Sequence, residues 1–155
     1  MRRKHRIERK YEPDIIYKSP LVTRFVNYLM KDGEKSVAQK VFYQTMERIK
    51  KQTNQDPLNI FNLAVENVSP DLEVKTKRIG GANYQIPQPV PDYRKTTLAF
   101  RWLIEISRSK KGKAMADKLS EELILASKNE GAAIKKKLDT HRMAEANRAF
   151  AHFRR

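Results

Sequence analysis

The chain has 155 residues, no cysteine, and 33 lysines and arginines against 18 aspartates and glutamates, which gives a formal net charge of +15 at pH 7. This length suits one domain with its own core, and the absence of cysteine from the sequence excludes disulfides and thiolate metal sites. A compact domain with this charge repels itself unless a polyanion neutralises it. Nucleic acid is therefore the first partner to expect and an anionic membrane surface the second.

Residues 1–18 are predicted to form a basic N-terminal arm. Six of the first ten residues are lysine or arginine, and no helical apolar pattern is present. The arm lacks the apolar stretch of a secretory signal, and no run in the chain approaches the roughly 20 apolar residues that cross a bilayer. We therefore expect the protein to remain in the compartment where it is made.

Helices are predicted from capping residues and from apolar side chains that recur every three to four positions. Two helices start with a cap followed by proline, at Ser19-Pro20 and at Asp56-Pro57. The expected starts are near residues 20, 35, 57, 92 and 115, and Trp102 lies on an apolar stripe that we assign to the core. The last 25 residues have a weak apolar pattern, so either one helix or a helix with an ordered tail fits them.

Residues 74–87, VKTKRIGGANYQIP, carry three basic residues and no acidic one, with Gly80-Gly81 between two extended runs. Two glycines supply the positive φ angles that a two-residue hairpin turn needs. The segment is therefore predicted to be a basic β-hairpin, followed by an extended, proline-rich return to the body. Tyr84 either stacks on a nucleobase or packs along this ribbon.

These patterns predict a mainly α fold: a single helical domain of about six helices with a protruding basic β-hairpin. The one domain covers residues 1–155, with the basic arm at 1–18, the β-ribbon at 72–90 and a basic C-terminal segment at 139–155. No internal repeat and no low-complexity linker divides the sequence.

Catalytic and cofactor motifs are absent from the sequence. The Gly112-Lys113 pair lacks the upstream glycine of a phosphate-cradling loop, and the three histidines do not have the spacing of a helical metal pair. His141 and Glu145 are four residues apart and form either half of a metal or acid–base site or an ordinary surface pair. We expect no enzymatic activity, no metal and no cofactor.

Basic residues cluster in the N-terminal arm, in the hairpin, in the loop after the fourth helix and in the C-terminal segment. Phosphate contacts release counterions additively, so several clusters matter more than any single lysine. The candidate RNA contacts in these clusters and on the helices are Arg2, Arg3, Lys4, Arg6, Arg9, Lys10, Lys35, Lys75, Lys77, Arg78, Arg94, Lys95, Arg101, Arg108, Lys110, Lys111, Lys113, Arg142 and Arg148.

Two other binding classes stay open. An architectural DNA-binding protein also combines a helical body with basic β-arms, but it usually places an apolar wedge at the arm tip. The tip here is the short run from Ile79 to Ala82, which is a weak wedge. A membrane-surface protein needs a helix with a strong, free apolar face, whereas the apolar faces in this chain are needed for the core.

Six stretches that span the chain carry a family resemblance: SPLVTRFVNYLMKDGEKS (19–36), DPL (56–58), KRIGGANYQIP (77–87), LAFRWL (98–103), KGKAMADKL (111–119) and DTHRMAEANRAFAHFR (139–154). They resemble small-subunit ribosomal protein seven of the bacterial and organellar type, and the last stretch is long and specific. Glu34 stands where that family usually has a lysine, so a phosphate contact is expected from Lys35 and not from position 34.

The resemblance implies direct binding to the 3′ domain of small-subunit ribosomal RNA, early nucleation of head assembly, and a place near the tRNA exit site and the messenger RNA path. It implies small-subunit ribosomal proteins nine and eleven as neighbours. It also implies a ribosome in the cytoplasm, or in an organellar matrix or stroma if the chain is organelle-encoded. Repression of its own messenger is left open. The residues placed toward tRNA and messenger RNA are Gly80, Gly81, Asn83, Tyr84, Arg154 and Arg155.

Overall fold

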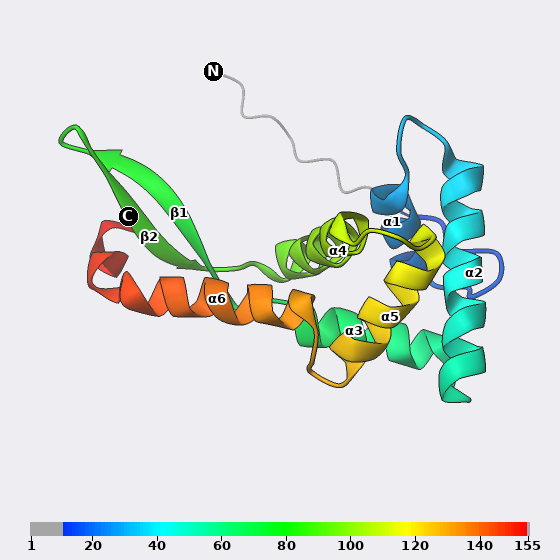
Figure 1. Cartoon of the computed structure of the whole chain (residues 1–155). Helices are drawn as coiled ribbons and strands as arrows, with labels where there is room; N and C mark the ends of the chain where they lie inside the picture. Colours follow the sequence, from blue (N-terminus) through cyan, green and yellow to red (C-terminus); the bar gives the residue numbers. More distant parts are fainter. Residues whose placement is uncertain (1–10, 155) are drawn as a thin grey trace, which may run out of the picture.

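Six α-helices, one 3-10 helix and two β-strands form residues 11–154, the part of the chain that the computed structural model describes (Figure 1). Five helices pack into a body, and the sixth extends from it beside the hairpin. The elements in chain order are α1 Pro20–Leu29, α2 Lys35–Thr53, α3 Pro57–Val68, β1 Leu72–Ile79, β2 Ala82–Pro89, α4 Asp92–Ser109, α5 Met115–Ser127, α6 Ala132–Ala146 and η1 Arg148–Arg154.

The first and third helices begin where the cap-plus-proline pattern predicts. Ser19 and Asp56 are the N-caps of α1 and α3, and a proline follows each of them. The Asp56 carboxylate accepts a hydrogen bond from the backbone N–H of Leu58 at 3.1 Å, which satisfies one of the free donors at the start of α3. All five predicted helix starts are confirmed to within a residue.

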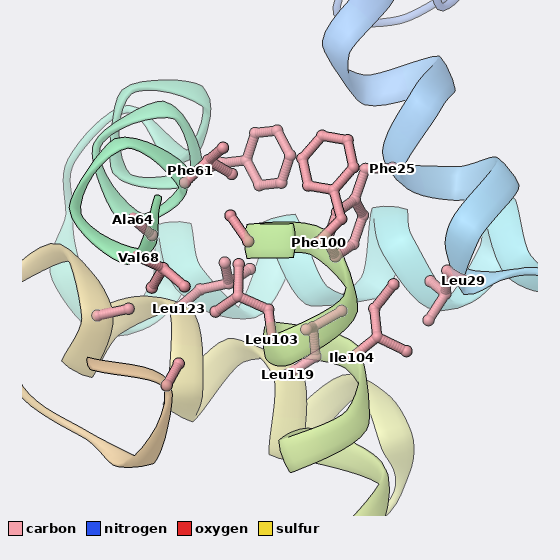
Figure 2. Close-up of a cluster of buried hydrophobic side chains, with 14 of the residues drawn as sticks. Phe25, Leu29, Phe61, Ala64, Val68, Phe100, Leu103, Ile104, Leu119 and Leu123 are labelled. Carbon is pink, nitrogen blue, oxygen red and sulfur yellow. The ribbon is translucent and has the colours of Figure 1, made fainter. Parts of the chain in front are cut away.

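The core is built around aromatic side chains from four different helices. Phe25 of α1 has its ring centroid 5.6 Å from that of Phe42 and 5.1 Å from those of Phe61 and Phe100, in tilted and edge-on geometries that favour aromatic pairs. Figure 2 shows Phe25, Phe61 and Phe100 converging in this cluster. Trp102 is 8% exposed and belongs to the same core, as predicted.

The two strands form an antiparallel hairpin that pairs from Leu72 with Pro89 to Ile79 with Ala82. Gly80 and Gly81 have φ angles of +58° and +92°, the left-handed values that the two-residue turn requires. The hairpin protrudes from the helical body (Figure 1), so the predicted β-arm is confirmed.

The C-terminal segment takes the second of the two forms that the sequence left open. Helix α6 ends at Ala146, and the 3-10 helix η1 follows it and packs against β2. In Figure 1 α6 runs away from the body along the hairpin, and η1 lies close to β2. The observed fold is thus a mainly helical single domain with a hairpin arm, as predicted.

Residues 11–18 of the predicted N-terminal arm contain an ordered turn. The Asp14 side chain is buried; its Oδ2 accepts hydrogen bonds from the N–H groups of Ile16 and Tyr17, and its Oδ1 accepts one from the Tyr43 hydroxyl at 2.7 Å. All the candidate RNA contacts of the arm lie in residues 1–10, outside the described residues. No helix in the described part of the chain is both long and apolar enough to cross a membrane.

Candidate nucleic-acid interface

Ion pairs fix the base of the hairpin to helix α4. The Arg94 guanidinium lies 2.8–2.9 Å from both carboxylate oxygens of Glu73, and Lys75 Nζ lies 3.1 Å from Glu73 Oε1. Beside them, Lys95 Nζ contacts Asp71 Oδ1 at 2.7 Å. This hydrogen bond lowers the pKa of the Asp71 carboxyl and raises that of the Lys95 ammonium. The arm therefore leaves the body in a defined direction.

The outer half of the hairpin is braced by η1. The Tyr84 ring packs against Phe150 and Phe153, with centroid separations of 5.4 and 5.5 Å. Opposite Tyr84 in the strand pairing is Lys77, whose Nζ donates a hydrogen bond to the carbonyl oxygen of Phe153 at 3.1 Å. Of the two interpretations of Tyr84, the structure shows packing, and its partners come from the C-terminal segment.

The side chains that remain open for a ligand on the hairpin lie near its tip. Arg78, Asn83, Gly80 and Gly81 are all exposed. Within the described part of the chain, Arg78 has no ion-pair partner within 4 Å, in contrast to Lys75. Arg78 is thus the basic side chain of the hairpin with its charge most available to a phosphate.

Four predicted contacts lie in the last turn of α4 and in the loop that joins it to α5, and three of them have partners inside the protein. Arg108 donates to the carbonyl oxygen of Leu29 at 2.9 Å. The Lys110 ammonium lies 2.6 Å from the buried carboxylate of Glu122, and Lys113 pairs with Glu121, which raises the pKa of Lys113 and lowers that of Glu121. The fourth residue, Lys111, is exposed.

Four further candidates lie on helix surfaces or at their ends. Lys35 is the first residue of α2, Arg101 is exposed on α4, and Arg148 is exposed at the start of η1. Arg142 of α6 is also exposed and lies 4.0 Å from Asp139, a distance at which a solvated ion pair has little strength.

Eight of the predicted contacts have side chains outside the described residues. Residue Arg154 ends η1, but its side chain lies outside the description. The others fall in residues 1–10 and 155, which the structure does not describe: Arg2, Arg3, Lys4, Arg6, Arg9, Lys10 and Arg155.

Several residues that shape this surface were missed by sequence reasoning. Glu73 and Glu122 hold predicted RNA contacts through ion pairs, and Phe150 and Phe153 brace the hairpin. Glu122 carried a detectable signal, because it lies on the same helical face as Leu119, Leu123 and Ala126, where an acidic residue is out of place. The phenylalanines carried a weaker signal, since they are three residues apart, which is the repeat of a 3-10 helix and not the 3.6-residue period of an α-helix.

His141 has a structural contact in the described residues. Its Nε2 accepts a hydrogen bond from the backbone N–H of Asp71 at 3.1 Å, which ties α6 to the start of the hairpin. Among residues 11–154 no group of three or more histidine or acidic side chains is arranged to hold a metal ion. His141 thus contributes a contact between α6 and the base of the hairpin, which neither of its two predicted interpretations included.

The arrangement as a whole is a rigid helical body that carries basic side chains on its surface and on a braced arm. Such separated basic surfaces suit the sugar–phosphate backbones of a folded nucleic acid, which a protein recognises through shape and charge. The fold and these surfaces define the class: a basic, mainly helical protein with a braced β-hairpin arm.

Comparison with known proteins gives the family. The family model described as ribosomal protein S7p/S5e matches residues 1–148. A protein of Thermosipho africanus named small ribosomal subunit protein uS7 is 54% identical to this chain over 154 residues, with 99% of both chains covered. The protein of the same name in Mycoplasmoides gallisepticum is 55% identical to it over 153 residues, with 98% of this chain and 99% of the relative covered. The protein of the same name in Solibacter usitatus is 53% identical to this chain over 153 residues, with 99% of this chain and 98% of the relative covered.

The chain belongs to the ribosomal protein S7p/S5e family. It is accordingly a ribosomal protein with a structural and not an enzymatic role, and the resemblance seen in its sequence is confirmed.

Proposed function

We propose that this protein binds the 3′ domain of small-subunit ribosomal RNA directly and nucleates assembly of the subunit head. The observation that carries the proposal is the fixed arm: Arg94 and Lys95 pin the hairpin to α4 through Glu73 and Asp71, and η1 braces its outer half. A rigid arm that meets one RNA segment while the body meets another holds the two at a set angle. Nucleation of assembly requires that kind of constraint.

Affinity in this mechanism comes from several weak basic surfaces acting together. Each surface that binds raises the effective concentration of the others, so no single one needs high affinity. Arg78 at the arm, Arg101 on α4 and Lys111 in the loop are exposed side chains on three separate elements. A-form RNA hides its base edges in a deep major groove, so such contacts are made to phosphates and to unpaired bases.

The proposal extends to the protein's surroundings. We place the hairpin tip and the C-terminal end toward exit-site tRNA and the messenger RNA path, with small-subunit ribosomal proteins nine and eleven as neighbours. The support is the family membership together with the exposed tip at Gly80, Gly81 and Asn83. The protein would act in ribosomes of a bacterial cytoplasm, or of an organellar matrix or stroma if it is organelle-encoded.

A salt titration of binding tests the RNA proposal. The ligands are a folded 3′-domain ribosomal RNA fragment, an unstructured RNA of equal length, and duplex DNA. We expect a preference for the folded fragment that persists at about 0.2 M salt, because shape-specific contacts survive when counterion release weakens. If the protein bound all three ligands equally and lost all three as the salt concentration rose, its binding would be that of any polycation, and the proposal would fail. A preference for duplex DNA would instead favour an architectural DNA-binding protein.

A charge-matched pair of variants tests the arm. Alanine at Lys75, Lys77 and Arg78 should weaken binding to the folded fragment and lower the salt slope by up to about 3, one for each lost phosphate contact. The control variant has alanine at Lys40, Lys50 and Lys51 of α2. It loses the same positive charge, but at the end of the body far from the hairpin (Figure 1). Equal effects of the two triple variants would remove the hairpin from the RNA-contacting surface.

A further inference from the structure

A hollow of about 320 Å³ lies between helices α1 and α4 on the body. Its lining comes from Tyr28 of α1 and from Arg101, Ile104, Glu105 and Arg108 of α4. The four α4 residues are spaced by three, one and three positions, which places them on one face of the helix. The volume is at the lower end of the range for small-ligand sites and suits a single ring system.

The apolar wall of the hollow is held in place. Ile104 is 4% exposed and belongs to the core, as its position in Figure 2 shows. The Tyr28 ring packs edge-on against Phe100 with a centroid separation of 5.8 Å, and its hydroxyl lies 3.4 Å from Thr97 Oγ1. An aromatic ring fixed in this way offers a surface that a nucleobase can stack on without first ordering it.

The polar groups around that wall are also positioned. The Arg108 guanidinium is anchored by its bond to the carbonyl oxygen of Leu29 at 2.9 Å, and Glu105 Oε2 is anchored by Lys136 Nζ at 2.7 Å. Arg101 is exposed on the same face of α4. The hollow therefore combines an aromatic surface, guanidinium donors and one carboxylate.

We propose that this hollow binds an unpaired guanine of the ribosomal RNA. This inference rests on the proposed function and adds which base binds beside α4. Guanine alone among the four bases offers two adjacent N–H donors on its Watson–Crick edge, which match a carboxylate such as Glu105. Its O6 and N7 atoms are the acceptors that arginine binds best, and Arg101 lines the same hollow. Tyr28 supplies the stacking surface.

The carboxylate distinguishes this site from a simple phosphate site. Glu105 has an exposed carboxylate in the lining, and this group only accepts hydrogen bonds, so it pairs with the N–H donors of a base and not with the oxygens of a phosphate. Adenine, cytosine and uracil each present at least one acceptor to the carboxylate where guanine presents donors. A mismatch of that kind leaves a polar group unpaired and lowers affinity.

The test uses the full-length protein and the four nucleoside monophosphates, which share one phosphate and differ only in the base. Binding is followed by NMR through the amide signals of α4 and the side-chain signals of Arg101. We expect GMP to bind at least about fivefold more tightly than AMP, CMP or UMP, the discrimination expected of one good paired contact. The Glu105→Gln variant should lose this preference and bind all four nucleotides alike.

The matched control is Glu121→Gln, which removes the same charge from another lysine-paired glutamate outside the hollow. It should keep the preference for GMP. Equal binding of all four nucleotides to the wild-type protein, or a GMP preference that survives in Glu105→Gln, would overturn the guanine site.

A second readout separates this proposal from the proposed function. In the complex with the folded RNA fragment, one guanine N7 should be protected from methylation by the wild-type protein and exposed in the Glu105→Gln complex. If the fragment binds but no guanine differs between the two complexes, the guanine site alone fails. If the wild-type protein shows no preference for the folded fragment, the proposed function fails whatever the nucleotides do.

Discussion

Arg94 of α4 and Glu73 of β1 form a two-point ion pair across the junction between the helical body and its arm. Arg94 Nε lies 2.9 Å from Glu73 Oε1, and Arg94 Nη2 lies 2.8 Å from Glu73 Oε2, while the Glu73 side chain is only 10% exposed. The planar guanidinium and the carboxylate match in shape, so the pair fixes orientation as well as distance. Arg94, which the sequence predicts to be an RNA contact, therefore holds the arm in place.

We predict that Arg94→Ala lowers the free energy of unfolding by about 1–3 kcal/mol, between the values for exposed and for buried pairs. The loss arises because Glu73 is then left with Lys75 as its remaining ion-pair partner in the described structure. Urea unfolding measures it. The control Lys51→Ala breaks the exposed pair with Glu47 and should cost less than about 0.5 kcal/mol. Equal small effects would mean that the junction pair does not stabilise the fold.

The two basic neighbours at the hairpin tip should contribute unequally to RNA binding. Arg78→Ala should lower the salt slope by about 1, as expected for one lost phosphate contact. Lys77→Ala should change it less, because the Lys77 ammonium already donates to the carbonyl oxygen of Phe153. Salt titrations of the two variants with the folded fragment measure both slopes. A larger change for Lys77 than for Arg78 would contradict this ordering.

The elements that were predictable from sequence are those decided by local chemistry. A proline after a capping residue sets the starts of α1 and α3, and the Gly80-Gly81 pair sets the hairpin turn. In each case the deciding residues are neighbours in the chain. The order of the first five helices followed from the same signals together with the 3.6-residue apolar period, whereas the weak apolar pattern of the last 25 residues left α6 and η1 undecided.

The candidate site was harder to predict because its decisive contacts are tertiary. Counting positive charges treats Arg94 and Arg101 alike, whereas one is paired with Glu73 and the other is exposed. Lys110 pairs with Glu122, twelve residues further along the chain. Whether a basic side chain is available to RNA depends on which carboxylate the fold brings beside it, and no local pattern records that.

The buried carboxylate of Glu122 should matter more to stability than any exposed acid in the described residues. It pairs with Lys110 at 2.6 Å and accepts the backbone N–H of Ala133 at 2.9 Å, so it joins α5 to the preceding loop and to the start of α6. We predict that Glu122→Ala costs about 3–5 kcal/mol, since it leaves a cavity and two unpaired donors. Thermal and urea unfolding measure the loss.

The matched control for this prediction is Glu121→Ala, one residue earlier on α5. Its pair with Lys113 is solvated, so we expect a cost below about 1 kcal/mol. The two variants have the same composition and the same charge. If they were equally stable, the buried position of Glu122 would carry no special weight.

Gly131, before the first residue of α6, should tolerate no side chain. Its φ angle is +94°, and an added Cβ would lie 3.0 Å from Glu122 Oε1 and 3.1 Å from Leu125 Cβ. We predict that Gly131→Ala costs more than about 2 kcal/mol, from backbone strain together with this crowding. Gly112→Ala is the control, because Gly112 has a similar φ of +86° with nothing within 4 Å of the added atom. The difference between the urea midpoints of the two variants measures the effect of crowding at Gly131, because both carry similar backbone strain. Equal midpoints would mean that crowding adds nothing to the cost.

Tyr43 should make the fold sensitive to high pH. Burial, the hydrogen bond to Asp14 and the charge of that carboxylate raise the pKa of the Tyr43 hydroxyl to about 12, against an ordinary value of 10.0. Below pH 10 the hydroxyl is protonated in both states, and its stabilising effect is fully present. Above pH 10 the unfolded chain loses this proton before the folded one, so stability falls as the pH rises through 12.

We expect the free energy of unfolding to fall more between about pH 10 and pH 12 in the wild-type protein than in Tyr43→Phe, which has no hydroxyl to titrate. Tyrosinate absorbance should show two of the six tyrosines ionising late in the wild-type titration, Tyr43 and Tyr17, because burial raises the pKa of both, and only one late step should remain in the variant. The variant keeps the Asp14 turn, because Ile16 and Tyr17 still donate to Oδ2. If two tyrosines still ionise late in Tyr43→Phe, the pKa of about 12 belongs to a tyrosine other than Tyr43.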